Sequence, residues 1–160
     1  MSPLHDAAAA QIADMLRSGP TTQLVGVGVD CEEFDAVARA DAMGGDRRRE
    51  RLFTRSELEA IGDNLGRQAS RFAAKEAVSK AIGTGFRQRI SPRHIEIISA
   101  PNGAPEVRLH GRAAEVARAE GIKRCMVTWS RTSREVLAVA LAVGGSDRRR
   151  PVSNDLEEWL

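Results

Sequence analysis

The sequence lacks several features that would mark a nucleic-acid-binding protein. It contains no tyrosine, and aromatic residues make up 4% of its 160 residues. Stacking of bases on aromatic side chains is therefore a poor explanation of what it binds. The 24 basic and 22 acidic residues leave a formal net charge of +2, too small to attract nucleic acid in general. We expect no nucleic acid among its partners.

Cysteines and long apolar runs are also scarce. Cys31 and Cys125 are the two cysteines, far apart and without a CxxC pattern, which argues against a disulfide scaffold or a zinc site. No segment approaches the roughly 20 apolar residues of a membrane span, and the start of the chain does not resemble a signal peptide. These absences predict a cytoplasmic protein without a membrane partner.

The pattern of apolar residues and helix breakers divides the chain into three parts. We expect an N-terminal helical extension over residues 1–22, a main domain over 23–145 and a flexible polar tail over 146–160. In the main domain, strands are predicted at 23–29, 94–99, 106–109, 125–130 and 136–143, and helices at 32–42, 54–61, 68–82 and 111–120. Gly44-Gly45 should end the first of these helices, and Thr54 with Glu57 should form a capping box. Neighbouring strands in hairpin-like order predict an α+β fold with an antiparallel sheet.

The stretch RFAAKEAVSKAIGTG at 71–85 is the first candidate for chemistry. Glu76 and Lys80 are four residues apart, so they project from the same side of a helix, with Gly83 about one turn further on. Taken alone, Glu76 is an ordinary surface glutamate paired with Lys80. A lysine beside a Gly-Thr-Gly turn could also hold phosphate through its charge and through backbone N–H groups.

Asp30 is the second candidate, because it follows an apolar Gly-x-Gly strand. Taken alone, it is better explained as the N-cap of the next helix. Taken together with Glu76, it suits Mg²⁺, which binds one or two carboxylates and fills its remaining positions with water and phosphate oxygens. The sequence does not decide between these interpretations.

Four motifs in order resemble the holo-[acyl-carrier-protein] synthase family of small phosphopantetheinyl transferases. They are LVGVGVD at 24–30, LFTRSELEAIG at 52–62, RFAAKEAVSKAIGTG at 71–85 and HIEIISAPNGAPEVRLHGRAAEVA at 94–117. The resemblance extends over residues 24–143. It implies that family's fold, an antiparallel sheet wrapped by helices, and a homotrimer with active sites between subunits. It also implies Mg²⁺-dependent transfer of the 4′-phosphopantetheine arm from coenzyme A to a serine of an acyl or polyketide carrier protein, which releases 3′,5′-ADP.

The resemblance also implies a role for each candidate residue. Asp30 and Glu76 would hold the metal, and with Lys80 they would form the catalytic set. Coenzyme A would contact Lys80, the turn formed by Gly83, Thr84 and Gly85, and Arg131. The serine proton would pass to a carboxylate or to a metal-bound water. The arginines at 47–51 would meet an acidic carrier protein.

Three departures from the family pattern leave a second hypothesis open. Ala36 stands where the family has arginine. Residues 126–131 read MVTWSR where the family has two histidines, and Arg131 stands at the second of these positions. Trp129 stands where the family has an aliphatic residue. Arg131 could replace the second histidine or be an ordinary strand-end arginine. The alternative function is a protein of this fold that has lost or changed the activity and binds, or acts on, a carrier-bound intermediate in a specialised, polyketide-type pathway.

Overall fold

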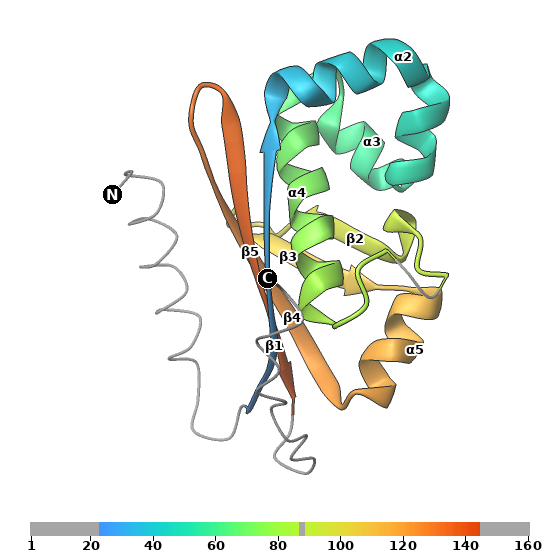
Figure 1. Cartoon of the computed structure of the whole chain (residues 1–160), viewed down its shortest axis with the longest axis vertical. Helices are drawn as coiled ribbons and strands as arrows, with labels where there is room; N and C mark the ends of the chain where they lie inside the picture. The colour runs from blue at the N-terminus through green and yellow to red at the C-terminus, as the bar shows by residue number, and fades with distance from the viewer. Residues whose placement is uncertain (1–22, 87–88, 145–160) are drawn as a thin grey trace, which may run out of the picture.

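The computed structural model of the chain describes residues 23–86 and 89–144 (Figure 1). The predicted N-terminal helix and C-terminal tail lie outside these residues. The described elements, in order, are β1 (Gln23–Glu33), α2 (Phe34–Leu52), α3 (Arg55–Ile61), α4 (Leu65–Ala81), a 3₁₀ turn (Pro92–His94), β2 (Ile95–Ser99), β3 (Pro105–Leu109), α5 (Gly111–Ala119), β4 (Ile122–Arg131) and β5 (Glu135–Gly144). The prediction of an α+β fold with antiparallel strands is confirmed.

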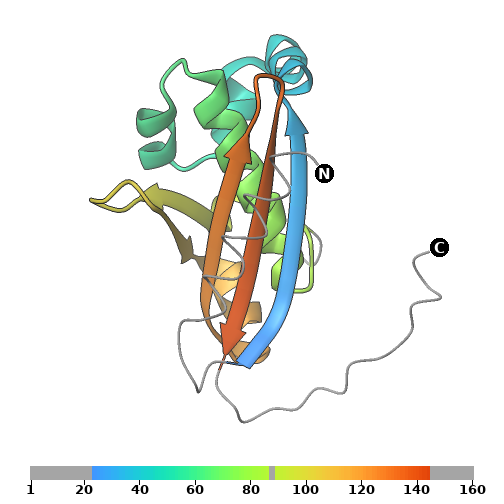
Figure 2. The same ribbon diagram turned by 90° about the vertical axis from the view of Figure 1, so that its left-hand side faces the viewer.

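The strands form two separate sheets rather than the one sheet that was expected. One has the order β1-β5-β4 and the other is the β2-β3 hairpin, and every pairing is antiparallel. Helix α4 lies against one face of the three-stranded sheet, as Figure 2 shows from the side of the strands. Helices α2 and α3 lie at the N-terminal end of α4. The β2-β3 hairpin packs against α4 and β4, and α5 lies next to β4, away from α2 and α3 (Figure 1).

Small residues allow α4 to approach the sheet closely. On α4 and β5 they are buried alanines, namely Ala73, Ala77, Ala81, Ala138, Ala140 and Ala142. On β1 they are glycines: a Cβ atom on Gly26 would lie 2.1 Å from the Ala81 carbonyl oxygen, and one on Gly28 would lie 1.9 Å from that of Ala77. The Gly-x-Gly stretch is therefore required by backbone packing. Because side chains alternate along a strand, Asp30 lies on the same face as these glycines, beside α4.

Strand β1 is longer than predicted, which changes the interpretation of Asp30. Its pairing with β5 continues to Glu33, which lies opposite Glu135. Helix α2 therefore begins at Phe34, and its N-cap residue is Glu33, without a side-chain capping bond. The N-cap interpretation of Asp30 is wrong, because Asp30 lies inside a paired strand.

The prediction that Gly44-Gly45 ends the first helix is confirmed, because Gly45 has non-helical backbone angles (φ 56°, ψ −156°) at a kink within α2. Beyond the kink, α2 resumes as a second helical stretch to Leu52, which was not predicted. The start of one other helix differs from the prediction. Helix α4 begins at Leu65, three residues earlier than expected, because the Asn64 side chain accepts a hydrogen bond from the Arg67 N–H at 2.9 Å.

The predicted capping box at the start of α3 is confirmed. Thr54 Oγ1 accepts from the Glu57 N–H at 3.3 Å, and the Thr54 N–H donates to Glu57 Oε2 at 2.8 Å. Among residues 23–86 and 89–144, no helix combines the length and apolar character needed to span a bilayer. The cytoplasmic location stays a prediction.

Candidate active site

Three carboxylates lie where β1 runs alongside α4. Asp30 and Glu32 are two residues apart on β1 and so point to the same face, and Glu76 reaches them from α4. Burial and, next, the charge of Asp30 raise the pKa of Glu76 to about 7. Burial also raises the pKa of Asp30 and of Glu32. The site therefore concentrates negative charge that a cation would stabilise.

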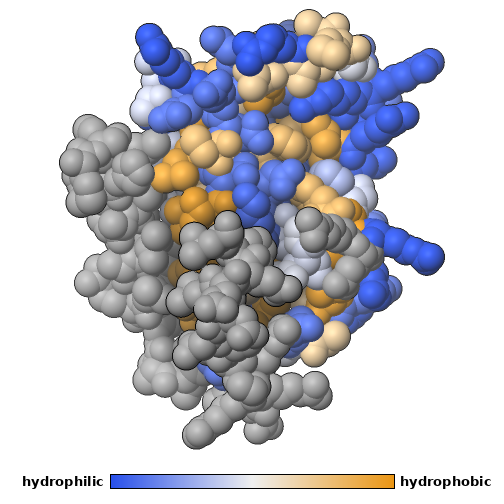
Figure 3. All heavy atoms as spheres, viewed as in Figure 1, coloured by the Kyte–Doolittle hydropathy of each residue, from blue (hydrophilic) through white to orange (hydrophobic). Residues whose placement is uncertain are grey.

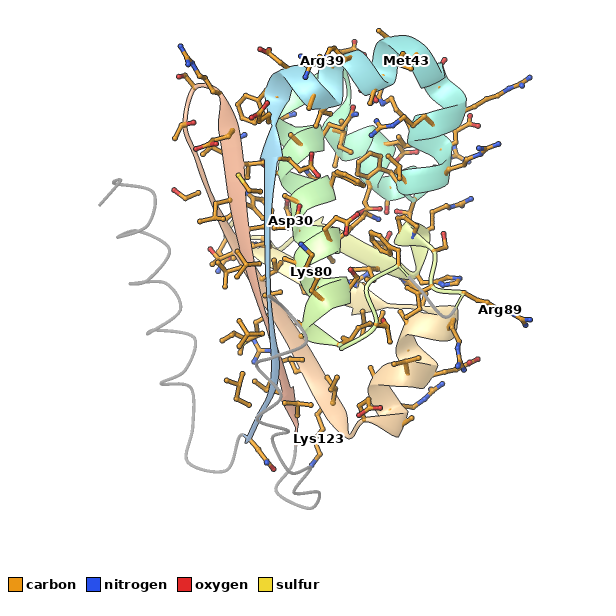
Figure 4. All side chains as sticks on the ribbon, viewed as in Figure 1. Asp30, Arg39, Met43, Lys80, Arg89 and Lys123 are labelled. Atoms are coloured by element: carbon orange, nitrogen blue, oxygen red, sulfur yellow. The ribbon has the colours of Figure 1, made fainter. Side chains whose placement is uncertain are left out.

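Lys80 is the cation that contacts Asp30 of this group (Figure 4). Its Nζ donates to Asp30 Oδ1 at 2.8 Å and to the Val29 carbonyl oxygen at 2.9 Å. The ion pair of Lys80 is therefore with Asp30, on a neighbouring strand, rather than the predicted surface pair with Glu76 one helical turn away. Sequence spacing along a helix could not show this pair.

The second oxygen of Asp30 fits a metal ligand. Asp30 Oδ2 is buried and accepts no hydrogen bond from any residue that the structure describes. Within these same residues, no group of three His, Cys, Asp or Glu side chains is arranged to hold a metal ion. Two carboxylates completed by water or by substrate oxygens are, however, a normal environment for Mg²⁺. Asp30 and Glu76 thus provide donors of the right kind.

The Gly-Thr-Gly turn closes the C-terminal end of α4. The N–H groups of Thr84 and Gly85 donate to the Ser79 carbonyl oxygen at 3.3 and 3.0 Å, and the Gly83 N–H donates to that of Lys80 at 2.9 Å. Gly83 and Gly85 have φ of 87° and 57°, which favours glycine. The expectation that these N–H groups are free to hold phosphate is wrong, because they cap the helix. The side chain of Lys80 is a charged donor at this end of α4.

Arg131 lies at the opposite end of α4. A Cβ atom on Gly66, in the first turn of α4, would lie 3.1 Å from Arg131 Nη1. The 17 residues of α4 span about 25 Å, so one chain does not bring Arg131 to the Gly83–Gly85 turn. Arg71 lies on the first half of α4, 6% exposed, and its Nε has no hydrogen-bond partner among the described residues. The predicted coenzyme A contacts are therefore divided between two ends of a helix.

Trp129 does not block the carboxylates. It lies opposite Ala138 of β5, and Asp30 lies opposite the same alanine from the other side. The two residues are therefore two strands, about 10 Å, apart on the face that carries α4. The indole packs against the hydrophobic core.

Two residues near the site were missed from the sequence. Glu32 follows the alternation that begins at Asp30, and a longer predicted strand would have found it. Lys75 precedes Glu76 on α4 but points elsewhere: its side chain is fully buried, and its Nζ donates to Glu57 Oε2 at 2.7 Å. The feature of the sequence that could have indicated this burial is a lysine among alanines.

Comparisons with known proteins identify relatives of this chain. Residues 26–140 match the model of the 4′-phosphopantetheinyl transferase superfamily. The holo-[acyl-carrier-protein] synthase of Nitratidesulfovibrio vulgaris (strain DP4) is 41% identical over 107 residues, which are 66% of this chain and 86% of the relative. That of Desulforudis audaxviator is 38% identical over 130 residues, 79% of this chain and 98% of the relative.

Solved structures with these names also match the fold. The holo-[acyl-carrier-protein] synthase of Neisseria meningitidis is 33% identical with a TM-score of 0.69, over 75% of this chain and 98% of that one. The Helicobacter pylori enzyme in complex with coenzyme A is 25% identical with a TM-score of 0.66, over 72% of this chain and 98% of that one. The chain belongs to the 4′-phosphopantetheinyl transferase superfamily and is an enzyme of its holo-[acyl-carrier-protein] synthase type.

Proposed function

We propose that the protein transfers the 4′-phosphopantetheine arm of coenzyme A to a serine of an acyl carrier protein, with Mg²⁺ bound by Asp30 and Glu76. The observation that carries the proposal is the meeting of Asp30, Glu76 and Lys80 at one place between β1 and α4. The names of the related enzymes, and the coenzyme A in the Helicobacter pylori structure, support the choice of substrates.

The transfer exchanges one phosphorus–oxygen bond for another. The serine oxygen bonds to the phosphorus that carries the pantetheine arm, and the bond from this phosphorus to the bridging oxygen breaks. 3′,5′-ADP leaves with the bridging oxygen and its electron pair, and the serine proton passes to a base in the site. Lys80, at the end of α4, supplies a point charge for a phosphate.

Mg²⁺ fits the donors that the site provides. Asp30 Oδ2 is a buried oxygen without a hydrogen-bond partner among the described residues, and burial raises the pKa of both Asp30 and Glu76. A divalent cation would relieve this unfavourable burial of charge. When bound, Mg²⁺ would supply electrophilic stabilisation of the negative charge on the phosphate oxygens.

The direct test is incubation of the protein with coenzyme A, Mg²⁺ and an apo carrier protein, followed by mass spectrometry of the carrier. We expect a mass gain of one phosphopantetheine arm, which should disappear when EDTA removes the metal. Several carriers, from fatty-acid and polyketide synthesis, should be compared. Binding of a carrier without any mass gain would contradict the proposal and support the alternative of a repurposed protein.

The active site we propose is shared between copies of this chain in a homotrimer. Arg131 lies at the N-terminal end of α4 and the carboxylates nearer its other half, so a neighbouring copy could bring Arg131 to the coenzyme A bound beside Lys80. An apolar face supports such contact: β1 is an edge strand, and Leu24, Val25, Val27 and Val29 are between 41% and 50% exposed. Figure 3 shows hydrophobic atoms gathered beside the course of β1.

Subunit mixing tests this assembly. We expect a Glu76→Gln chain and an Arg131→Glu chain to be poorly active alone and to regain about a quarter of wild-type activity when exchanged at equal amounts, because random trimers then contain that share of intact sites. Carrier modification measures activity, and native mass spectrometry verifies mixed trimers. Mixed trimers without recovered activity would show that each site lies within one chain.

We expect the carrier protein to dock on α2, near the sharp bend at Gly45. The arginines of this helix have different roles. Arg48 pairs with Asp41, and Arg49 donates to the Gly62 carbonyl oxygen, so both hold the fold together. Arg47 and Arg51 instead line a shallow hollow of about 620 Å³ together with Glu50, Leu52, Ser91, Pro92 and Arg93.

The first half of α2 carries further exposed residues. Arg39 and Met43 are four residues apart, and Met43 is 89% exposed (Figure 4). Exposed arginines around an apolar side chain suit an acidic carrier with an apolar patch. Arg47→Glu should raise the KM for the carrier about threefold to tenfold without changing the KM for coenzyme A. Arg118→Glu on α5, with the same change of charge, is the control. Equal effects of both variants would contradict docking at α2.

A further inference from the structure

Lys80 holds the carboxylate that the proposed function assigns to the metal. Its ammonium group contacts Asp30 Oδ1 at 2.8 Å and the Val29 carbonyl oxygen at 2.9 Å. The side chain of Asp30 is 13% exposed, whereas that of Lys80 is 47% exposed. The lysine therefore reaches a buried acid from the side of the solvent, and its flexible stem can swing away without disturbing the core.

The contacts of Asp30 show what the Lys80 ammonium group does at this carboxylate. Asp30 Oδ2 has no hydrogen-bond partner among the described residues, so the ammonium group of Lys80 is the polar group bound to this carboxylate. Glu76 and Glu32 are close enough to repel Asp30, and Lys80 opposes the repulsion. A divalent cation on Oδ2 would add a second positive charge to the carboxylate that already binds Lys80 through Oδ1, and like charges this close repel.

We infer that Lys80 and a divalent cation are alternative partners of Asp30, so that binding of the cation releases Lys80 toward the phosphates of coenzyme A. This inference rests on the proposed function, because it takes Asp30 as a metal ligand. The release couples the two ligands: the cation frees a charged donor at the end of α4, and a phosphate that binds this donor stabilises the cation-bound state. Lys80 thus disfavours the cation alone and favours it together with coenzyme A.

The lysines of this chain allow a direct measurement. There are three, Lys75, Lys80 and Lys123. An amine-reactive acylating reagent followed by peptide mass spectrometry reports each one separately. Mg²⁺ alone should increase the labelling of Lys80 about twofold to fivefold, because the ion pair with Asp30 is broken. Subsequent addition of coenzyme A should lower it again.

The other two lysines are internal controls. Lys123 is exposed at the start of β4, far from Asp30 in Figure 4, and its labelling should not respond to Mg²⁺. The side chain of Lys75 is fully buried and should stay unlabelled while the protein is folded. Sodium chloride at matched ionic strength should leave Lys80 unchanged, which separates cation binding from general screening.

Calorimetry of Mg²⁺ binding without coenzyme A gives a second measurement. Lys80→Met removes the competing charge and should tighten Mg²⁺ binding about threefold to tenfold. Lys123→Met removes the same charge elsewhere and should leave the affinity unchanged. Equal affinities of the wild type and Lys80→Met would contradict the exchange.

An Asp30→Asn variant distinguishes failure of the exchange from failure of the proposed metal site. If Mg²⁺ binds the wild type and not this variant, but the labelling of Lys80 does not respond to Mg²⁺, the exchange is wrong and the proposed metal site stands. If Mg²⁺ binds the wild type and Asp30→Asn equally, or binds neither even with coenzyme A present, the metal site and the exchange are both wrong.

Discussion

Replacing Glu76 with glutamine is expected to lower the rate of carrier modification about a thousandfold, because the change removes one of two carboxylates that we propose hold Mg²⁺. Glutamine has almost the same size and is uncharged, so packing between β1 and α4 should be kept. The measurement is the rate of mass gain of the carrier at saturating coenzyme A and carrier. Glu115→Gln on the exposed face of α5 is the matched control and should retain full activity.

The same variant should be more stable than the wild type when metal is absent. The folded protein raises the pKa of Glu76 from 4.5 to about 7, through burial and then through Asp30. The folded state therefore binds a proton that the unfolded state has lost, and wild-type stability falls as the pH rises from about 4.5 to about 7. Glutamine removes this dependence.

Urea unfolding in EDTA checks this expectation. The gain in stability of Glu76→Gln should be full at pH 8 and should vanish near pH 4. A residue that destabilises the metal-free protein and is needed for activity is typical of a functional site. Full transferase activity of Glu76→Gln would show that the assignment of the metal site is wrong, whatever its effect on stability.

Among the variants proposed here, Lys75→Met should lose the most stability, about 3 to 5 kcal/mol. The neighbouring Glu76→Gln change is expected to have the opposite effect in the absence of metal. The side chains of Lys75 and Glu57 are both fully buried, with 2.7 Å between Nζ and Oε2. Lys75 Nζ also donates to the carbonyl oxygens of Ile95 and Pro92, at 2.7 and 3.0 Å, and lies 5.4 Å from the centre of the Phe53 ring. Methionine fills the space but leaves the charge of Glu57 buried.

Glu57 shows why the loss should spread beyond one contact. Its Oε1 accepts from the Ile97 N–H at 2.9 Å, and its Oε2 accepts from the Thr54 N–H at 2.8 Å. The pair therefore joins the start of α3, the middle of α4 and strand β2. Urea unfolding measures the change in the free energy of unfolding.

Two comparisons make the Lys75 result specific. Arg55→Ala breaks an ion pair with Glu59 at 3.1 Å, but the Arg55 side chain is 94% exposed, so stability should change by less than about 0.5 kcal/mol. The double variant Lys75→Met with Glu57→Gln removes both charges and keeps an acceptor oxygen for a backbone N–H group, so it should recover part of the loss. A loss below about 1 kcal/mol for Lys75→Met alone would contradict a stabilising role for the pair.

Local patterns predicted much of the secondary structure. The capping box at Thr54 needs residues that are three apart, and the helix around Glu76 follows from its composition, so both could be read from neighbouring residues. The error at the end of β1 has a non-local cause, because that end depends on pairing with β5 about a hundred residues away. The Gly44-Gly45 pair did indicate the kink in α2, but the helical stretch that follows it to Leu52 was not predicted.

The sequence by itself determined which residue types are available and to which family the pattern belongs: an aspartate after Gly-x-Gly, a glutamate and lysine one helical turn apart, and no tyrosine for stacking. The tertiary structure alone decided which charges meet. It pairs Lys80 with Asp30, buries Lys75 against Glu57 and places Arg131 at the far end of α4. The physical reason is that these contacts depend on which helix face packs on which strand, and residues distant in the sequence, such as the small ones that let α4 approach β1 and β5, determine that packing.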